Sequence, residues 1–77
     1  MGSSGRDRQI QRKLGDRVRA LRKEKGFSQE GFADACGLHR TYMGSVERGE
    51  TNPTLSSLAT IAKTLKITTS KLLEGVD

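Results

Sequence analysis

Residues 37–49 carry the side chains of this sequence that are best suited to binding another molecule. They read GLHRTYMGSVERG. In a helix, which turns by about 100° per residue, Met43 and Val46 would lie on one side. The opposite side would carry small and basic residues: Arg40, Thr41, Gly44, Ser45 and Arg48. A helix surface that only faces solvent favours Glu and Lys, and glycine inside a helix costs about 1 kcal/mol relative to alanine, so this side indicates close approach of another surface.

This small and basic side has the chemistry needed to read DNA. The major groove admits a helix and displays hydrogen-bond donors and acceptors on the base edges. Arg40 could contact guanine O6 and N7 together, Thr41 could bond a base or touch a thymine methyl group, and Ser45 could reach a base deeper along the helix. Tyr42, at the edge of this side, could contact a thymine or a phosphate, or could pack its ring against the protein. The sequence therefore predicts base contacts from Arg40, Thr41, Tyr42 and Ser45.

Residues on either side of this face are predicted to contact DNA phosphates. They are Gln29, His39, Arg48, Thr51 and Asn52. Gln29 would begin a helix, where backbone N–H groups and a side-chain amide can both bind a phosphate. His39 would cap the following helix and could also touch a phosphate. Asn52 is equally well interpreted as a turn residue before the single proline.

Glu47 needs a separate explanation because a carboxylate beside such a face repels DNA. It would lie next to the buried side of its helix, and we expect it to form an ion pair with Arg22. A buried pair of this kind fixes the geometry of two helices more than it adds net stability.

Apolar residues recur at helical spacing in five segments, and no segment shows the alternation of a strand. The predicted helices cover about residues 8–25, 29–36, 40–48, 55–65 and 69–74. Ser28, His39 and Thr54 are expected to cap the starts of the second, third and fourth helices, and Gly26 and Gly49 to end the first and third. The sequence therefore predicts an all-α domain of five short helices.

Two of these helices, joined by a turn that contains Gly37, have the arrangement of a helix-turn-helix over about residues 28–48. We place the domain at residues 8–77. Residues 1–7 begin with MGSSG and are expected to form a disordered tail, either native or left from expression.

The composition fits a small basic domain with an anionic partner. The 77 residues carry a net charge of +5, and residues 6–25 hold nine Lys and Arg against three acidic residues, a local charge of +6. This charge is compatible with a solvated helix or with nucleic-acid binding. One His and one Cys provide neither a catalytic set nor a metal cluster, so no enzyme activity, metal or cofactor is expected. No apolar run approaches the roughly 20 residues that cross a membrane, so no membrane association is predicted.

The stretches LRKEKGFSQEGFA, GLHRTY, ERGETNPTL and LATIAKTL resemble the phage-repressor-like helix-turn-helix proteins of the Xre family. The resemblance runs from about Leu14 to Leu73 and implies the five-helix fold of the lambda repressor DNA-binding domain. GLHRTY followed by ERG is similar to the controller proteins of restriction–modification systems, which are small dimeric regulators of palindromic operators.

The resemblance also implies roles for individual residues. The family's glutamine in the second helix maps to Gln29, its base readers map to Arg40, Thr41 and Ser45, and the controller group adds Tyr42. The family's ion pair between helices maps to Arg22 and Glu47. Gly31 departs from the family, which usually has an acid or a good helix former there, and removes the capping-box partner of Ser28.

A homodimer is expected because a two-fold dimer places two reading helices about 34 Å apart on one face of DNA. The apolar residues near the C-terminus exceed the apparent needs of a small core and are therefore candidates for a dimer interface. They are Leu65, Ile67, Leu72, Leu73 and Val76.

The sequence thus predicts a sequence-specific regulator of transcription that binds double-stranded DNA as a homodimer in a bacterial or phage context, in the cytoplasm at the nucleoid. No small-molecule ligand is evident. Two alternatives remain open. One is an antitoxin-type interaction module that binds DNA for autoregulation, and the other is the DNA-binding domain of a larger, ligand-sensing regulator.

Overall fold

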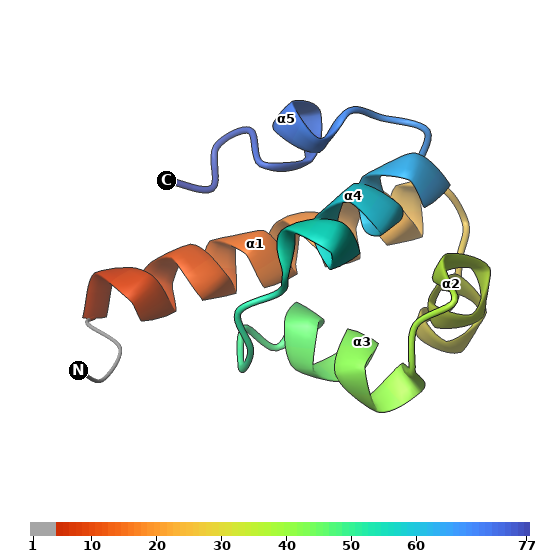
Figure 1. The fold of residues 1–77 in the computed structure, drawn as a ribbon, viewed down its shortest axis with the longest axis horizontal. Coiled ribbons are helices and arrows are strands. Elements are labelled where there is room, and N and C mark those ends of the chain that lie inside the picture. The colour runs from red at the N-terminus through yellow and green to blue at the C-terminus, as the bar shows by residue number, and fades with distance from the viewer. Residues whose placement is uncertain (1–4) are drawn as a thin grey trace.

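The computed structural model describes residues 5–77, which form five helices and, within this range, no strand. The helices are α1 (Gly5–Glu24), α2 (Gln29–Cys36), α3 (Arg40–Glu47), α4 (Leu55–Thr64) and α5 (Thr69–Leu72). α1 runs the length of the molecule, with α3 on one side of it and α5 on the other (Figure 1). The predicted all-α fold of five helices is confirmed.

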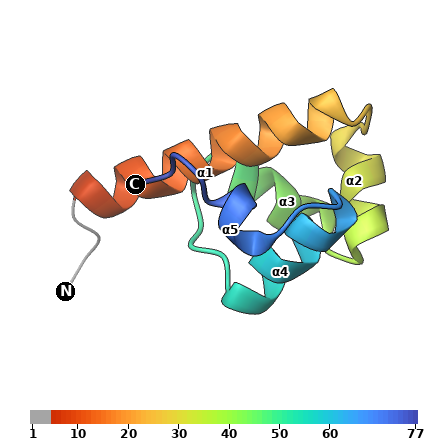
Figure 2. The ribbon, with the colours of Figure 1, turned by 90° about the horizontal axis from the view of Figure 1, so that it is seen from above.

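The first helix begins earlier than the sequence predicted. α1 starts at Gly5 rather than near Arg8, so residues 5–7 of the expected tail form its first turn. Asp7 lies in this turn, where a carboxylate interacts favourably with the positive end of the helix dipole. The N-terminal turns of α1 extend past α3 and α4 (Figures 1 and 2). The remainder of the predicted tail, residues 1–4, lies outside the described residues.

Side-chain caps define the starts of the later helices. The Ser28 hydroxyl accepts a hydrogen bond from the Gly31 N–H at 3.0 Å, although Gly31 supplies no capping-box partner. Immediately beside this cap, the rings of Phe27 and Phe32 lie 5.2 Å apart, as a hydrophobic staple would place them. Thr54 caps α4 in the same way as Ser28 caps α2. These local interactions position α2 and α4 on the core.

The core takes side chains from all five helices and from the C-terminal residues. Its most buried large residues include Phe32, Met43 and Ile61, all with no exposed area. The core also includes Leu65, Leu72 and Val76, which are at most 6% exposed. The single chain therefore buries these three of the five dimer-interface candidates in its own core, and a dimer interface stays a prediction. Ile67 and Leu73 are partly buried against the same core. Among residues 5–77, Leu55 is the large apolar residue that is exposed, at 73%.

α1 and α3 approach each other closely at a glycine. A Cβ atom at Gly15 would lie 2.5 Å from the carbonyl oxygen of Glu47 and 2.6 Å from that of Val46. A second close approach joins Gly49, just after α3, to the backbone of Arg12. Gly49 also has φ of 71°, a left-handed conformation that favours glycine. These two glycines bring the last turn of α3 against α1.

In residues 5–77, no helix is both long and apolar enough to cross a membrane.

Candidate nucleic-acid interface

The turn between α2 and α3 is built by a glycine and a histidine. Gly37 ends α2 in a left-handed conformation, with φ of 69°, and its N–H points to the last carbonyl groups of that helix. His39 then begins α3, because its Nδ1 accepts a hydrogen bond from the Thr41 N–H at 3.1 Å. With Nδ1 used in the cap, Nε2 is the His39 nitrogen that remains for the predicted phosphate contact.

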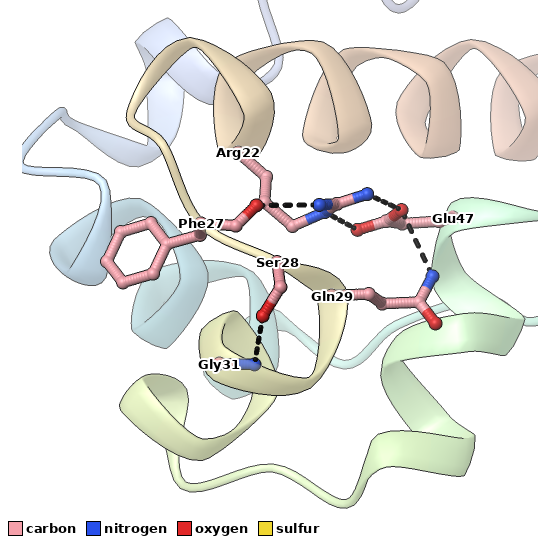
Figure 3. A network of polar contacts seen from close by, with 6 residues as sticks. All are labelled: Arg22, Phe27, Ser28, Gln29, Gly31 and Glu47. Carbon is pink, nitrogen blue, oxygen red and sulfur yellow. Dashed lines mark hydrogen bonds and ion pairs between the residues drawn. The ribbon is translucent and has the colours of Figure 1, made fainter.

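A buried ion pair fixes α3 to α1 (Figure 3). Arg22 donates from Nε and Nη2 to the two carboxylate oxygens of Glu47, at 2.7 and 3.0 Å, and each residue is 7% exposed. Arg22 also donates from Nη1 to the Phe27 carbonyl oxygen at 2.8 Å. These are the two residues that the sequence analysis paired. The carboxylate of Glu47 is therefore turned inward, away from the exposed side of α3.

Gln29 joins this network from the start of α2. Its Nε2 donates to Glu47 Oε1 at 3.2 Å, so its carbonyl oxygen points away from the carboxylate (Figure 3). Gln29 is exposed at the first turn of α2, the position from which it was predicted to bind a phosphate. Glu47 thus sets the orientation of a side chain on the adjacent helix.

The predicted base-reading residues differ in their exposure and in their contacts with the rest of the protein. Thr41 is exposed and Ser45 is half-buried on α3. Tyr42 is half-buried and its ring packs against the core, which favours the packing interpretation of this residue. Arg40 is exposed at the start of α3, where Nη1 lies 3.4 Å from Glu30 Oε2 and Nη2 lies 3.6 Å from Asp34 Oδ2.

The predicted phosphate contacts after α3 occupy the segment that leads to α4. Arg48 ends α3, and its Nε pairs with Glu50 Oε1 at 3.0 Å. Thr51 is half-buried and Asn52 is exposed just before the buried Pro53.

Gly44 differs from the sequence-based expectation. It was expected to be a bare position on the exposed side of α3, but it is buried. The side chains of Arg48 and Gln29 cover it, since a Cβ atom there would lie 2.9 Å from Arg48 Nη1 and 3.6 Å from Gln29 Oε1. Periodicity could not show this, because the two covering side chains come from different helices.

Part of the basic charge of α1 holds the C-terminal end of the chain. Arg17 donates from Nη2 to the Lys71 carbonyl oxygen at 2.9 Å and from Nε to that of Leu72 at 3.3 Å, and Lys13 donates to the Asp77 carbonyl oxygen at 3.4 Å. Cations near the last carbonyl groups of a helix are favourable. This role was not predictable from the sequence, because the spacing of basic residues within α1 carries no information about α5.

Cys36 is buried, and this burial raises the pKa of its thiol, while a hydrogen bond with Thr64 acts in the opposite direction. A thiol with a raised pKa is a poor nucleophile at neutral pH. Within residues 5–77, no group of three His, Cys, Asp or Glu side chains is arranged to hold a metal ion. The exposed polar surface of α2 and α3 is therefore the candidate site.

Comparison with known proteins identifies the family of this chain. Residues 18–72 match the HTH_3 helix-turn-helix family. The chain is 52% identical over 60 residues to the control protein C.SmaI of Serratia marcescens, covering 78% of this chain and 71% of that protein. It superposes on the restriction–modification controller protein C.AhdI of Aeromonas hydrophila with a TM-score of 0.77 at 44% identity, covering 79% of this chain and 92% of that one.

The structure of a third relative has been solved with DNA bound. The structure of SinR, the master regulator for biofilm formation, in complex with DNA matches with a TM-score of 0.75 at 34% identity, covering 79% of this chain and 98% of that one. The chain shares the lambda-repressor-like fold of these proteins. It therefore belongs to the HTH_3, or Xre, family of DNA-binding helix-turn-helix transcriptional regulators, which are not enzymes, and it is similar to restriction–modification controller proteins.

Proposed function

We propose that this protein reads a specific operator by placing α3 in the major groove of DNA. The exposed side of α3 presents Arg40, Thr41 and Ser45, and the buried ion pair of Glu47 keeps the carboxylate of α3 itself away from that side. Thr41 and Ser45 are short hydrogen-bonding side chains, which let a helix lie deep in the groove. The turned-in carboxylate of Glu47 is the observation that carries this proposal, since a carboxylate on the exposed side would repel DNA.

Phosphate contacts would hold α3 in register. Gln29 lies at the N-terminus of α2, where backbone N–H groups accompany its amide. His39, Thr51 and Asn52 flank the two ends of α3. Such contacts fix orientation without reading sequence, so their loss is expected to weaken binding to all DNA alike.

A homodimer on a palindromic operator fits this arrangement. Two copies related by a two-fold axis would present two α3 helices to successive major grooves on one face of the duplex. Ile67, Leu73 and the exposed Leu55 are the apolar side chains from which an interface could be built. Sedimentation at tens of micromolar tests this part, and a monomer at that concentration would contradict it. We also place the protein in the cytoplasm, where the DNA of a bacterium lies.

Selection of binding sites from random duplex DNA tests the function itself, at a stated salt near 150 mM because protein–DNA affinity depends steeply on salt. A two-fold symmetric motif is expected. Arg40→Ala should then weaken the selected site by about 1 to 3 kcal/mol and relax the preference at one base pair. Lys63→Ala removes an exposed charge on α4 and serves as the control. An equal loss on selected and random DNA for Arg40→Ala would contradict its base-reading role, and the absence of any motif would contradict specific recognition.

A further inference from the structure

Arg48 and Gly44 lie one helical turn apart on α3, and their arrangement was not expected from the sequence. The guanidinium group of Arg48 folds back along the helix over Gly44, since a Cβ atom at Gly44 would lie 2.9 Å from Nη1 and 3.7 Å from Cζ of Arg48. Arg40, Gly44 and Arg48 follow one another at a spacing of four residues, so they share one face of α3. The end of the guanidinium group therefore lies over Gly44.

Glu50 holds the Arg48 side chain, and Gln29 lies close to the same part of α3. Glu50 Oε1 pairs with Arg48 Nε at 3.0 Å. The side-chain carbonyl oxygen of Gln29 lies 3.6 Å from where the same Cβ atom would be. Glu47 orients this oxygen by accepting the hydrogen bond from Gln29 Nε2. The arrangement places an acceptor oxygen beside the guanidinium group.

Arg40 and Arg48 differ in the contacts that their guanidinium nitrogens make. Both terminal nitrogens of Arg40 lie near carboxylates of α2. In Arg48, which is itself exposed, Nε pairs with Glu50 and Nη1 lies over Gly44. A pair of guanidinium nitrogens is the group that bonds guanine O6 and N7 together in the major groove.

We propose that Arg48 reads a base, most naturally a guanine, and that Gly44 is the positioning residue that makes this contact possible. The proposal rests on the proposed function, because it requires α3 to lie in the major groove. It replaces the sequence-based assignment of Arg48 to a phosphate. A side chain at position 44 would displace the guanidinium group from the reading side of α3.

Three variants of the full chain test this proposal against the motif selected by the wild type. Arg48→Lys keeps the positive charge but loses the paired donors, so it should lower affinity for the selected site by about 5- to 100-fold and relax one base pair. Arg48→Ala should do the same. Gly44→Ala should fold, because the atom it meets is the end of a flexible side chain, and should show the same relaxed base pair. Gly5→Ala is the matched control, since a Cβ atom there meets nothing within 4 Å.

The outcomes separate this proposal from the proposed function. Relaxed preference at one shared base pair in Arg48→Lys and Gly44→Ala, with affinity for random DNA nearly unchanged, supports a base contact. If Arg48→Lys selects the wild-type motif, or if Arg48→Ala loses affinity equally on selected and random DNA, Arg48 binds a phosphate and the proposal is overturned while the proposed function stands. If the wild type selects no motif, both are overturned.

Discussion

Gly15→Ala is the substitution that most directly perturbs the position of α3, the helix that we propose reads DNA. The added Cβ atom would meet the backbone carbonyl oxygens of Val46 and Glu47, at 2.6 and 2.5 Å. Ordinary van der Waals contact at such a Cβ begins at about 3.4 Å, so the last turn of α3 must move away from α1 by about 0.9 Å. A backbone cannot avoid this contact by changing a rotamer, so α3 must shift or tilt as a unit.

The size of the effect follows from two opposing contributions. Inserting a methyl group into a well-packed contact costs typically 1 to 3 kcal/mol, and a contact with rigid backbone belongs at about the upper end. Alanine recovers about 1 kcal/mol through its higher helix propensity. The expected net loss is therefore about 2 kcal/mol. For a domain of this size such a loss lowers the melting temperature by about 8 to 16 °C.

Thermal unfolding followed by circular dichroism measures the loss, with Gly5→Ala as control. Gly5 lies in the same helix, and its added Cβ atom meets nothing within 4 Å, so that variant should be as stable as the wild type or slightly more stable. Affinity for the selected DNA should also fall in Gly15→Ala, because the displaced turn precedes Arg48. If Gly15→Ala melts at or above the temperature of the Gly5→Ala variant, the close contact between α1 and α3 does not exist as described.

Two further predictions concern the charged residues around α3. Glu47→Gln leaves the buried guanidinium of Arg22 without its carboxylate and should destabilise the fold by about 3 to 5 kcal/mol in urea unfolding; a loss below about 1 kcal/mol would indicate a solvated pair. Glu30→Gln combined with Asp34→Asn should raise affinity for the selected DNA, since each exposed pair with Arg40 contributes about 0.2 to 1 kcal/mol to the free protein. The same double substitution in an Arg40→Ala background, titrated with DNA, measures the gain in affinity that comes from the lower negative charge alone. An equal gain in that background would show that the ion pairs with Arg40 do not limit DNA binding.

Local signals in the sequence were sufficient for the helices and for one long-range contact. Ser28 and Thr54 are caps in the structure as predicted, because a cap depends on residues only three positions away. The pair of Arg22 and Glu47 was also placed correctly, since a carboxylate on the flank of a DNA-reading helix needs a partner on its buried side. In each case, the need for a hydrogen-bonding or charged partner followed from the sequence of one helix alone.

Contacts that depend on the packing of several helices were not predictable in this way. Leu72 and Val76 were expected at a dimer interface, because the sequence does not show that the C-terminal segment folds back to complete the core. The binding of Arg17 to the carbonyl groups at the end of α5 depends on the same packing. The cover over Gly44 combines side chains from α2 and the end of α3, so neither helix reveals it alone.

The two arginines of α3 are expected to contribute to recognition to different degrees. Arg40 must leave two exposed carboxylates to reach a base, and these pairs together offset about 0.4 to 2 kcal/mol of the 1 to 3 kcal/mol that a paired guanine contact typically provides. Arg48 pairs with Glu50 through Nε, and its Nη1 lies over Gly44. Because Arg48 already lies over Gly44 in the free protein, it has fewer contacts to break before it reaches a base. Less of the energy of its base contact is therefore offset. We therefore expect the base pair read by Arg48 to be at least as strongly preferred in the selected motif as the one read by Arg40.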